Sequence, residues 1–335
     1  MRILFLAHPE QDYLQYMIFN GLCEVYGEEE IIVYPFVLSY MGVDDRFYVL
    51  NDGSRGMTNP CDYMVKRDMR MWTFEEVVEN LKDTLFILLA SPRSYNVKAL
   101  RFLKKHFSPL PPIVFMDGED GIDIKWDLIN EFNPIVSFKR ELTQDLSSKN
   151  IFPLPFSAIV NEFTKEDKPK DLDVFCLMGD THERRRKIIK RLLEENLPNS
   201  YIGIDSGRLP WQDPERFKIA PLKSYSDYID LMSRAKINIS IRGWGFDSVR
   251  KWEVMLFSGL VLADKLDIII PNDFKDGEHL VYYKDEEDII KKIHYYLSHD
   301  SEREKIGKAG REYCYKFHTN SSRVKYMLEK IQHYF

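Results

Sequence analysis

Residues 238–264 read NISIRGWGFDSVRKWEVMLFSGLVLAD, and this stretch says most about the fold. Apolar runs at both ends predict buried strands, and the pattern between them predicts an amphipathic helix that opens near Asp247 and stops at Gly259. The loop before the helix holds Gly243 and Gly245, which would let backbone approach a ligand closely. Charged residues in a loop and first helical turn between two buried strands indicate a binding site, and here they are Arg242, Asp247, Arg250 and Glu253.

The same alternation of short apolar runs and helical patterns extends along the chain, which predicts an α/β fold on parallel sheets. In the first part we expect strands at 3–7, 31–34, 85–90, 113–116 and 135–138, helices at 10–26, 73–81 and 95–106, and a long loop at 40–72. In the second part we expect strands at 174–177, 201–204, 237–241 and 260–263, with helices at 182–196, 225–234, 248–258, 285–298, 301–315 and 321–333.

Residues 161–173, NEFTKEDKPKDLD, separate the two series. They are charged, contain a proline and show no periodicity, which is typical of a linker. A chain of 335 residues is also longer than one hydrophobic core usually spans. We therefore predict one domain over 1–160 and a second over 174–320.

Composition narrows the functional classes. The formal net charge is −6, so no global basic field indicates nucleic acid as a partner. No apolar stretch approaches the roughly 20 residues needed to span a bilayer, so any membrane contact would be peripheral. The cysteines lack metal-ligand spacing, and we expect reduced, mostly buried thiols of a cytoplasmic protein. They are Cys23, Cys61, Cys176 and Cys314.

Residues 174–189, VFCLMGDTHERRRKII, form a strand, turn and helix pattern. Gly179 would allow a tight turn, and Asp180 or Thr181 would cap the helix. The helix N-terminus and Arg184 would then face a phosphate. The alternative is an ordinary capped helix whose basic residues face solvent. Neither a dinucleotide fingerprint nor a P-loop is present in the sequence.

Arg250 and Glu253 lie three positions apart and so share one face of the helix in the opening stretch. Asp247 or Ser248 would cap that helix. A carboxylate accepts hydrogen bonds from both hydroxyls of a ribose, and an arginine beside it neutralises phosphate. The alternative is a surface ion pair worth under about 1 kcal/mol.

The pattern FDSVRKWEVMLFSGLVLAD, followed by the segment at 268–319, resembles the donor-binding domain of GT-B glycosyltransferases. The shared features are Arg-x-x-Glu followed by hydrophobic residues, a glycine and an apolar strand. In the N-terminal half, VFMDGEDG and SFKREL resemble bacterial sugar transferases of the same broad group. The resemblance implies two Rossmann-like α/β domains that face a cleft, with residues 321–335 crossing back to the first domain.

The resemblance also implies roles for residues. Glu253 would bind the nucleotide ribose, while Arg250 and the turn from Gly179 to Arg184 would face the diphosphate. The donor would be a UDP- or GDP-linked sugar bound by the C-terminal domain, with no cofactor and no metal. Many retaining members carry a second glutamate eight positions before the first, and this chain has Gly245 there. The stereochemistry therefore stays open.

Residues 116–121, MDGEDG, follow a predicted strand of the N-terminal domain, on the acceptor side. Asp117, Glu119 and Asp120 are candidates for the general base, because crowded carboxylates raise one another's pKa. The alternative is an acidic turn in which Asp117 is a cap. His8, directly after the first strand, is a further candidate for the site or a structural histidine.

The resemblance implies transfer of a sugar from a nucleotide-diphosphate sugar to a hydroxyl of a glycan, a lipid-linked sugar or a small molecule. One alternative is a DNA-base glucosyltransferase of the bacteriophage type, which the net charge disfavours. The other is a non-catalytic protein that binds nucleotide sugars.

Overall fold

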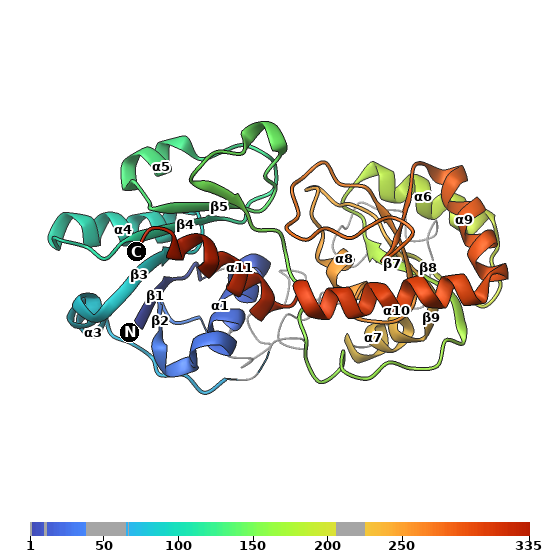
Figure 1. The fold of residues 1–335 in the computed structure, drawn as a ribbon, viewed down its shortest axis with the longest axis horizontal. Helices are drawn as coiled ribbons and strands as arrows, with labels where there is room; N and C mark the ends of the chain where they lie inside the picture. The colour runs from blue at the N-terminus through green and yellow to red at the C-terminus, as the bar shows by residue number, and fades with distance from the viewer. Residues whose placement is uncertain (1, 10–11, 38–64, 66, 206–224) are drawn as a thin grey trace.

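The computed structural model describes residues 2–9, 12–37, 65, 67–205 and 225–335. Its N-terminal domain is built on a six-stranded parallel sheet in the order β2-β1-β3-β4-β5-β6 (Figure 1). The strands are β1 (Arg2–Leu6), β2 (Ile31–Tyr34), β3 (Thr84–Leu89), β4 (Ile113–Asp117), β5 (Val136–Lys139) and β6 (Ile151–Pro153). The helices are α1 (Tyr13–Tyr26), α3 (Phe74–Asn80), α4 (Ser94–His106) and α5 (Trp126–Phe132).

Both faces of this sheet are buried, as expected for parallel strands. Alternate residues of β1 enter different cores. Ile3 and Phe5 pack with α1, whereas Leu4 and Leu6 pack with α3 and α4. The continuous apolar runs in the sequence are the consequence of this two-sided burial.

The C-terminal domain has five parallel strands in the order β11-β10-β9-β7-β8. They are β7 (Leu172–Gly179), β8 (Tyr201–Asp205), β9 (Ala235–Ser240), β10 (Leu260–Asp264) and β11 (Val281–Tyr283). The helices of this part are α6 (Glu183–Glu194), α7 (Tyr225–Arg234), α8 (Val249–Val254), α9 (Glu286–Ser298) and α10 (Asp300–Phe317).

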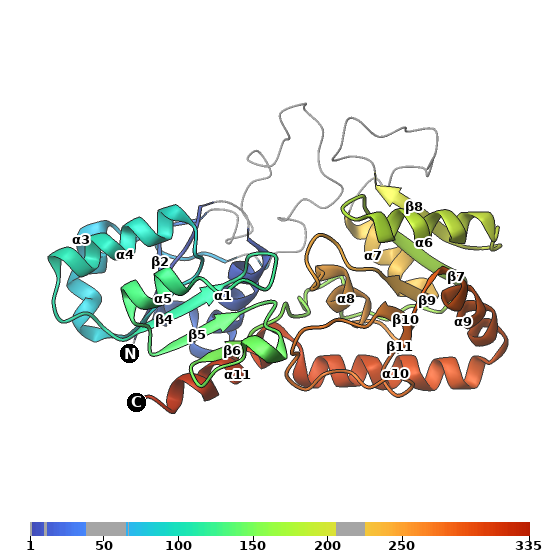
Figure 2. The same cartoon turned by 90° about the horizontal axis from the view of Figure 1, so that it is seen from above.

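The chain crosses between the domains twice, and the two crossings lie side by side. Helix α10 runs along the C-terminal domain, and α11 (Asn320–Gln332) lies on the N-terminal domain against α1 (Figures 1 and 2). Gly21 of α1 touches α11 closely, since a Cβ there would come within 2.5 Å of the Asn320 carbonyl oxygen. At the crossings the Ala158 amide donates to the His318 carbonyl oxygen at 2.7 Å.

Most predicted elements are present, with ends shifted by one to three residues. The predicted helix at 248–258 is too long, because α8 ends at Val254 and turns lead into β10. β6, β11 and α5 were not predicted. Most of the loop predicted at 40–72 lies outside the described residues. The domain limits stay predictions; β7 itself begins at Leu172.

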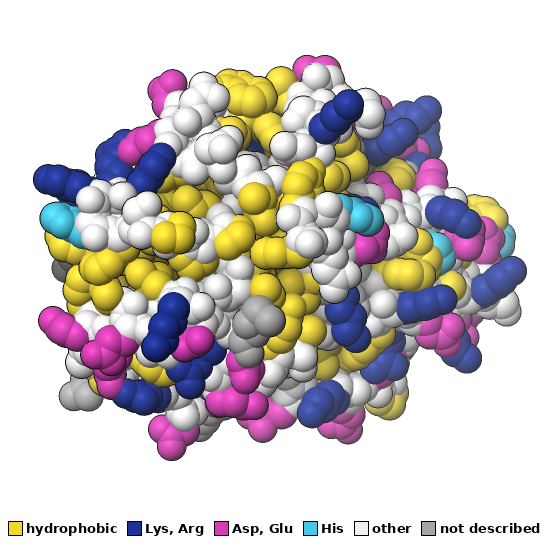
Figure 3. Space-filling model, turned by 60° about the vertical axis from the view of Figure 1, so that its left-hand side comes forward, with side chains coloured by type: hydrophobic (Ala, Val, Ile, Leu, Met, Phe, Trp, Pro, Cys, Tyr) yellow, Lys and Arg dark blue, Asp and Glu magenta, His cyan; other side chains and the backbone are white. Residues whose placement is uncertain are grey.

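No described helix is long and apolar enough to cross a membrane. Cys23, Cys176 and Cys314 are free and buried, as predicted, and Cys61 lies outside the described residues. Seen with the N-terminal domain forward, the surface carries hydrophobic side chains in its middle (Figure 3). Lysine and arginine are interspersed with acidic side chains on this face, so it presents no field of a single sign.

Candidate functional site

Two loops at the carboxyl ends of β7 and β9 lie against each other. A Cβ on Gly243 would stand 3.0 Å from Thr181 Oγ1 and 3.2 Å from a guanidinium nitrogen of Arg185. Glycine therefore lets the β7–α6 loop and the β9–α8 loop approach each other closely. Thr181 Oγ1 and Arg242 Nε are both buried, and neither has a hydrogen-bond partner within the described parts of the chain.

Arginines gather around this contact between the two loops. Arg185 is buried and donates to the carbonyl oxygens of Gly179 at 2.8 Å and Arg242 at 2.9 Å. The guanidinium of Arg242 stacks 4.2 Å from the Phe246 ring. Neither Arg185 nor Arg242 forms an ion pair with a carboxylate among the described residues. Burial, and then the charge of Arg250, lowers the pKa of Arg185 to about 10.

The side chain of His182 lies close to the same arginines. It is the N-cap of α6, and its Nδ1 accepts a hydrogen bond from the Arg184 amide at 3.1 Å. Burial, then the charges of Arg242 and Arg185, lowers the pKa of His182. The ring is therefore neutral at pH 7, as an accepting Nδ1 requires. An anion in this place would relieve the repulsion among these cations.

The predicted residues of the β7–α6 turn have more varied roles. Asp180 does not cap α6, because its carboxylate pairs with Arg186 at 2.7 Å. Arg184 is balanced by Asp264, whose carboxylate lies 2.8 Å from Arg184 Nε. Gly179 does not have a positive φ, and the nearest atom to a Cβ there would be 3.9 Å away. The turn thus does not need glycine at position 179 for its backbone shape.

Arg250 and Glu253 lie on one face of α8, as their spacing predicted, and both contact the side chain of Tyr228. The Tyr228 hydroxyl donates to Glu253 Oε2 at 3.1 Å, and the Arg250 guanidinium lies 4.4 Å from the Tyr228 ring centroid. Burial raises the pKa of Glu253, and the charge of Arg250 opposes this. Both residues are half-buried and are linked through Tyr228, unlike a solvated surface ion pair.

Asp247 holds the domains together. Its carboxylate is buried and accepts from the Phe156 amide at 2.6 Å and from Trp252 Nε1 at 2.8 Å. Ser248, the second predicted cap, is the N-cap of α8 but makes no side-chain hydrogen bond there. Asp247 thus has its oxygens directed at protein donors.

Gly245 lies at the same contact between the two domains. A Cβ on Gly245 would overlap Glu141 Oε1 and lie 2.7 Å from Asp120 Oδ1. Glu141 is fully buried and accepts from the amides of Gly121 at 2.8 Å and Asp247 at 3.0 Å. The close approach that glycine permits at position 245 is therefore made by carboxylates of the N-terminal domain.

The acidic turn after β4 places its carboxylates differently. Asp117 is buried, with Oδ2 3.1 Å from Lys139 Nζ and Oδ1 accepting from the Glu119 amide at 3.0 Å. Glu119 pairs with Arg93 Nε at 2.7 Å. Asp120 is paired with Arg140, and its side chain is 60% exposed. Asp117 is thus a turn cap in a buried ion pair, whereas Asp120 faces solvent.

His8 and Arg140 lie beyond the carboxyl ends of strands of the N-terminal sheet. His8 is buried after β1, its amide donates to Gln15 Oε1 at 2.7 Å, and its ring meets the Tyr95 ring edge-on. Arg140 reaches across the boundary and donates to the Asp247 carbonyl oxygen at 2.9 Å. The carboxyl ends of β4 and β5 are therefore joined to the β9–α8 loop of the other sheet.

The described residues contain no group of three or more histidine, cysteine, aspartate or glutamate side chains placed to hold a metal ion.

Comparison with known proteins identifies the architecture. A family model described as glycosyl transferase-like matches residues 184–329. HepE of Anabaena, solved with UDP-glucose, superposes with a TM-score of 0.62 at 11% identity, over 99% of both chains. A glycosyltransferase from Rickettsia africae gives a TM-score of 0.62 at 12% identity, over 98% of this chain and 97% of that one. The chain has the GT-B fold.

A third GT-B structure is an α-glucosyltransferase solved with UDP-glucose and DNA that contains an abasic site. It superposes with a TM-score of 0.59 at 10% identity, over 98% of both chains. No curated protein sequence matches the chain. The GT-B fold is thus supported over the full length, and the glycosyl transferase-like match covers the C-terminal part.

Several residues of this candidate site were not predicted. Arg185 was considered only in the alternative in which the basic residues of the helix face solvent, although it shares a helical face with Ile188, Ile189 and Leu192, so the sequence did carry a signal. Asp264, Tyr228 and Glu141 carry no such signal, because they reach the site only through the packing of separate elements.

Proposed function

We propose that the protein transfers a sugar from a nucleoside-diphosphate sugar to an acceptor hydroxyl. The observation that carries this proposal is the arginine cluster, in which Arg185 and Arg242 have no carboxylate partner in the described structure. Two like charges beside buried polar atoms without partners suit a bound anion. The GT-B fold and the glycosyl transferase-like match support a diphosphate as that anion.

The chemistry follows from charge. The departing nucleoside diphosphate gains negative charge as the bond to the sugar breaks. Arg185, Arg242 and Arg250, with the N-terminus of α6, would stabilise that charge. Glu253 would accept both ribose hydroxyls and fix the nucleoside. HepE was solved with UDP-glucose, and we propose UDP-sugars as the first donor class.

An acceptor hydroxyl loses its proton as it attacks. The four predicted candidates for the base remain His8, Asp117, Glu119 and Asp120. Asp117 is the least suited, because both its oxygens already accept hydrogen bonds. Glu119 and Asp120 are more exposed, and Asp120 lies against Gly245 of the C-terminal domain. We favour them as the base if the reaction inverts the anomeric centre.

A thermal-shift panel of UDP-sugars, GDP-sugars, NAD and ATP tests the donor. A ligand at 100 times its dissociation constant adds about 2.7 kcal/mol to the free energy of unfolding. We expect UDP- or GDP-sugars to stabilise the protein and NAD and ATP to do so weakly. A flat response to every nucleotide sugar would contradict the proposal.

We propose that the reaction needs no metal ion. The guanidinium groups and the α6 N-terminus would neutralise the diphosphate in its place. Turnover of UDP-sugar should therefore survive excess EDTA. Loss of turnover with EDTA, and its restoration by Mn²⁺, would show that this proposal is wrong.

The alternatives differ in acceptor and in chemistry. A DNA acceptor has the GT-B α-glucosyltransferase as its precedent, but a formal net charge of −6 disfavours it. A non-catalytic binder would bind UDP-glucose without consuming it, which a hydrolysis assay would detect. Free, buried cysteines suit a reducing compartment, and we propose a cytoplasmic location.

A further inference from the structure

Trp244 is placed unusually for a tryptophan. Its side chain is 76% exposed, the highest fraction of any large hydrophobic residue in the described ranges. Tryptophan is highly buried on average, because its indole ring carries a large apolar area. An exposed indole in a loop at the carboxyl end of β9 therefore suggests that a ligand covers it.

The contacts of its two neighbours show where Trp244 lies. On one side, Gly243 adjoins Thr181 and Arg185, which belong to the proposed diphosphate site. On the other, Gly245 adjoins Asp120 and the buried Glu141 of the N-terminal domain. Trp244 is therefore bracketed by the donor site and by the acidic turn of the acceptor side. A sugar that is transferred must pass through this boundary.

A fixed carboxylate lies against the residue that follows Trp244, since a Cβ on Gly245 would stand 2.7 Å from Asp120 Oδ1. The Asp120 side chain is 60% exposed, yet it is paired with Arg140, whose side chain is only 2% exposed. Arg140 is itself held by the carbonyl oxygens of Gly118 and Asp247, both at 2.9 Å. Asp120 is thus an exposed hydrogen-bond acceptor on a rigid support.

We propose that Trp244 is a stacking platform for a pyranose ring, and that Asp120 accepts hydrogen bonds from the hydroxyls of that ring. The C–H face of a pyranose is apolar, while its rim carries hydroxyl donors. An exposed indole and an exposed carboxylate at the same boundary between the domains match both properties. This proposal rests on the proposed function. The ring belongs either to an acceptor saccharide or to the donor sugar, and the same chemistry serves both.

Calorimetric titration separates the two sources. Wild type and Trp244→Ala are titrated with UDP, with UDP-glucose, and with maltose, cellobiose, lactose and chitobiose in the presence of UDP. Trp244→Phe tests rescue by another aromatic ring. Trp126→Ala is the matched control, because Trp126 is also exposed but begins α5. Thermal unfolding checks that each variant is folded.

We expect Trp244→Ala to bind UDP as wild type does. A platform for the acceptor ring gives at least about tenfold weaker disaccharide binding. A platform for the donor ring instead removes the advantage of UDP-glucose over UDP. Trp244→Phe should recover part of either loss, and Trp126→Ala should match wild type.

The proposal is overturned if Trp244→Ala binds UDP-glucose and all four disaccharides as wild type does. It is also overturned if wild type binds UDP but gains nothing from any sugar ring. If wild type binds neither UDP nor UDP-glucose, the proposed function fails. Disaccharide binding that depends on Trp244 would then still support the platform.

Discussion

Asp117 shows how burial decides between two roles for one carboxylate. Both oxygens accept hydrogen bonds, one from the Lys139 ammonium at 3.1 Å and one from the Glu119 amide at 3.0 Å. Burial raises the pKa of Asp117, and the charge of Lys139 opposes that rise. A carboxylate in this position stabilises the turn and leaves little room for an acceptor hydroxyl.

We expect Asp117→Asn to destabilise the fold by about 3 kcal/mol, because it leaves the Lys139 charge buried without its partner. Turnover per folded molecule should stay within a few-fold of wild type. Melting temperature and turnover are measured on the same preparation. Turnover reduced by about 10²–10⁴ at an unchanged melting temperature would instead make Asp117 the base.

Glu253 should make donor binding depend on pH. Burial raises its pKa above the ordinary value of 4.5, and only the charged form accepts from both ribose hydroxyls. UDP affinity should therefore fall as the pH drops through that raised pKa. Glu253→Gln should weaken UDP binding at pH 7 by about 1–3 kcal/mol. The UDP affinity of Glu253→Gln should vary with pH only through the titration of the nucleotide's own phosphate.

The stability of the fold should depend on pH in the opposite direction from the UDP affinity. Because the folded state binds a proton on Glu253 more readily than the unfolded chain, stability falls as the pH rises from 4.5 to the raised pKa. Glu253→Gln should therefore be at least as stable as wild type at pH 7. Calorimetry over a pH series measures the affinity, and thermal unfolding measures the stability. Equal UDP affinity in both proteins at pH 7 would refute the ribose assignment.

At the scale of elements, the β9–α8 loop depends on its glycines for space. We expect Gly245→Ala to lower stability by about 1–3 kcal/mol, because its Cβ would overlap the buried Glu141 carboxylate. Gly179→Ala is the matched control, since the nearest atom to its Cβ would be 3.9 Å away. Thermal unfolding compares them, and equal melting temperatures would argue against this contact between the domains.

Long elements were predictable, and short ones at the edges were not. β6 and β11 have three residues each, and α5 has seven, so each is shorter than the window over which a periodic pattern identifies a strand or a helix. β6 also ends at Pro153, which an edge strand tolerates and a sequence pattern counts as a breaker. Such strands form because a longer neighbour offers free backbone groups.

The candidate site was predictable where its residues share an element. Arg250 and Glu253 are three positions apart on α8, so their spacing brings them together on Tyr228. Glu141 and Gly245 meet only because two sheets come together. No periodicity links residues in separate domains, so the contact of Gly245 with Glu141 was not predicted, and its close approach to a ligand stays a prediction.

At the scale of the molecule, the two sheets are joined through their carboxyl ends and through the paired crossings. Arg140 and Asp247 connect the ends, while Arg323 of α11 donates to the Phe156 carbonyl oxygen at 3.0 Å. Arg323 also donates to His318 Nδ1 at 3.2 Å, which keeps that buried ring neutral. The loops that carry the proposed diphosphate, ribose and acceptor residues thus adjoin one boundary.

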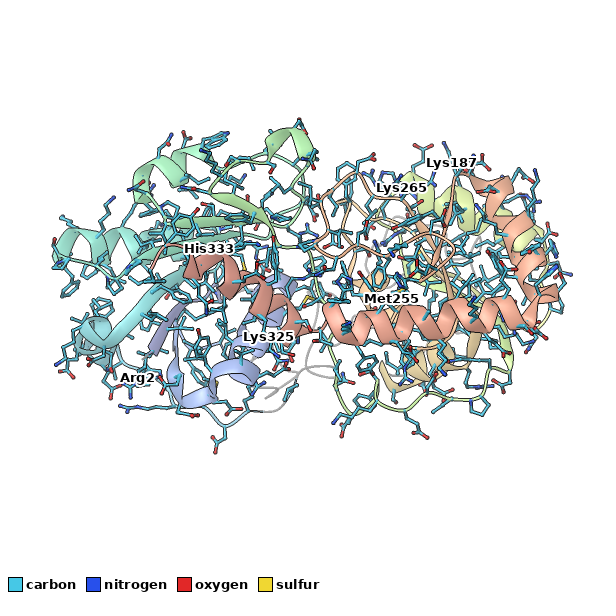
Figure 4. The ribbon with its side chains drawn as sticks, viewed as in Figure 1. Arg2, Lys187, Met255, Lys265, Lys325 and His333 are labelled. Atoms are coloured by element: carbon cyan, nitrogen blue, oxygen red, sulfur yellow. The ribbon has the colours of Figure 1, made fainter. Side chains whose placement is uncertain are left out.

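Calorimetric titration of the protein with UDP and with uridine tests the central claim, that the arginine cluster binds a diphosphate. Arg242→Met removes one cation of the cluster. Lys187→Met is the control, since Lys187 lies at the outer edge of the C-terminal domain and pairs with Glu183 (Figure 4). Met255, by contrast, is buried inside the C-terminal domain, where α10 packs against it (Figure 4).

We expect UDP to bind at least about 100-fold more tightly than uridine, which corresponds to about 2.7 kcal/mol. Arg242→Met should weaken UDP binding by about 2 kcal/mol and leave uridine binding unchanged, whereas Lys187→Met should match wild type for both. Equal affinity of wild type for UDP and uridine, or UDP binding unaffected by Arg242→Met, would contradict the assignment of this cluster to a nucleoside diphosphate.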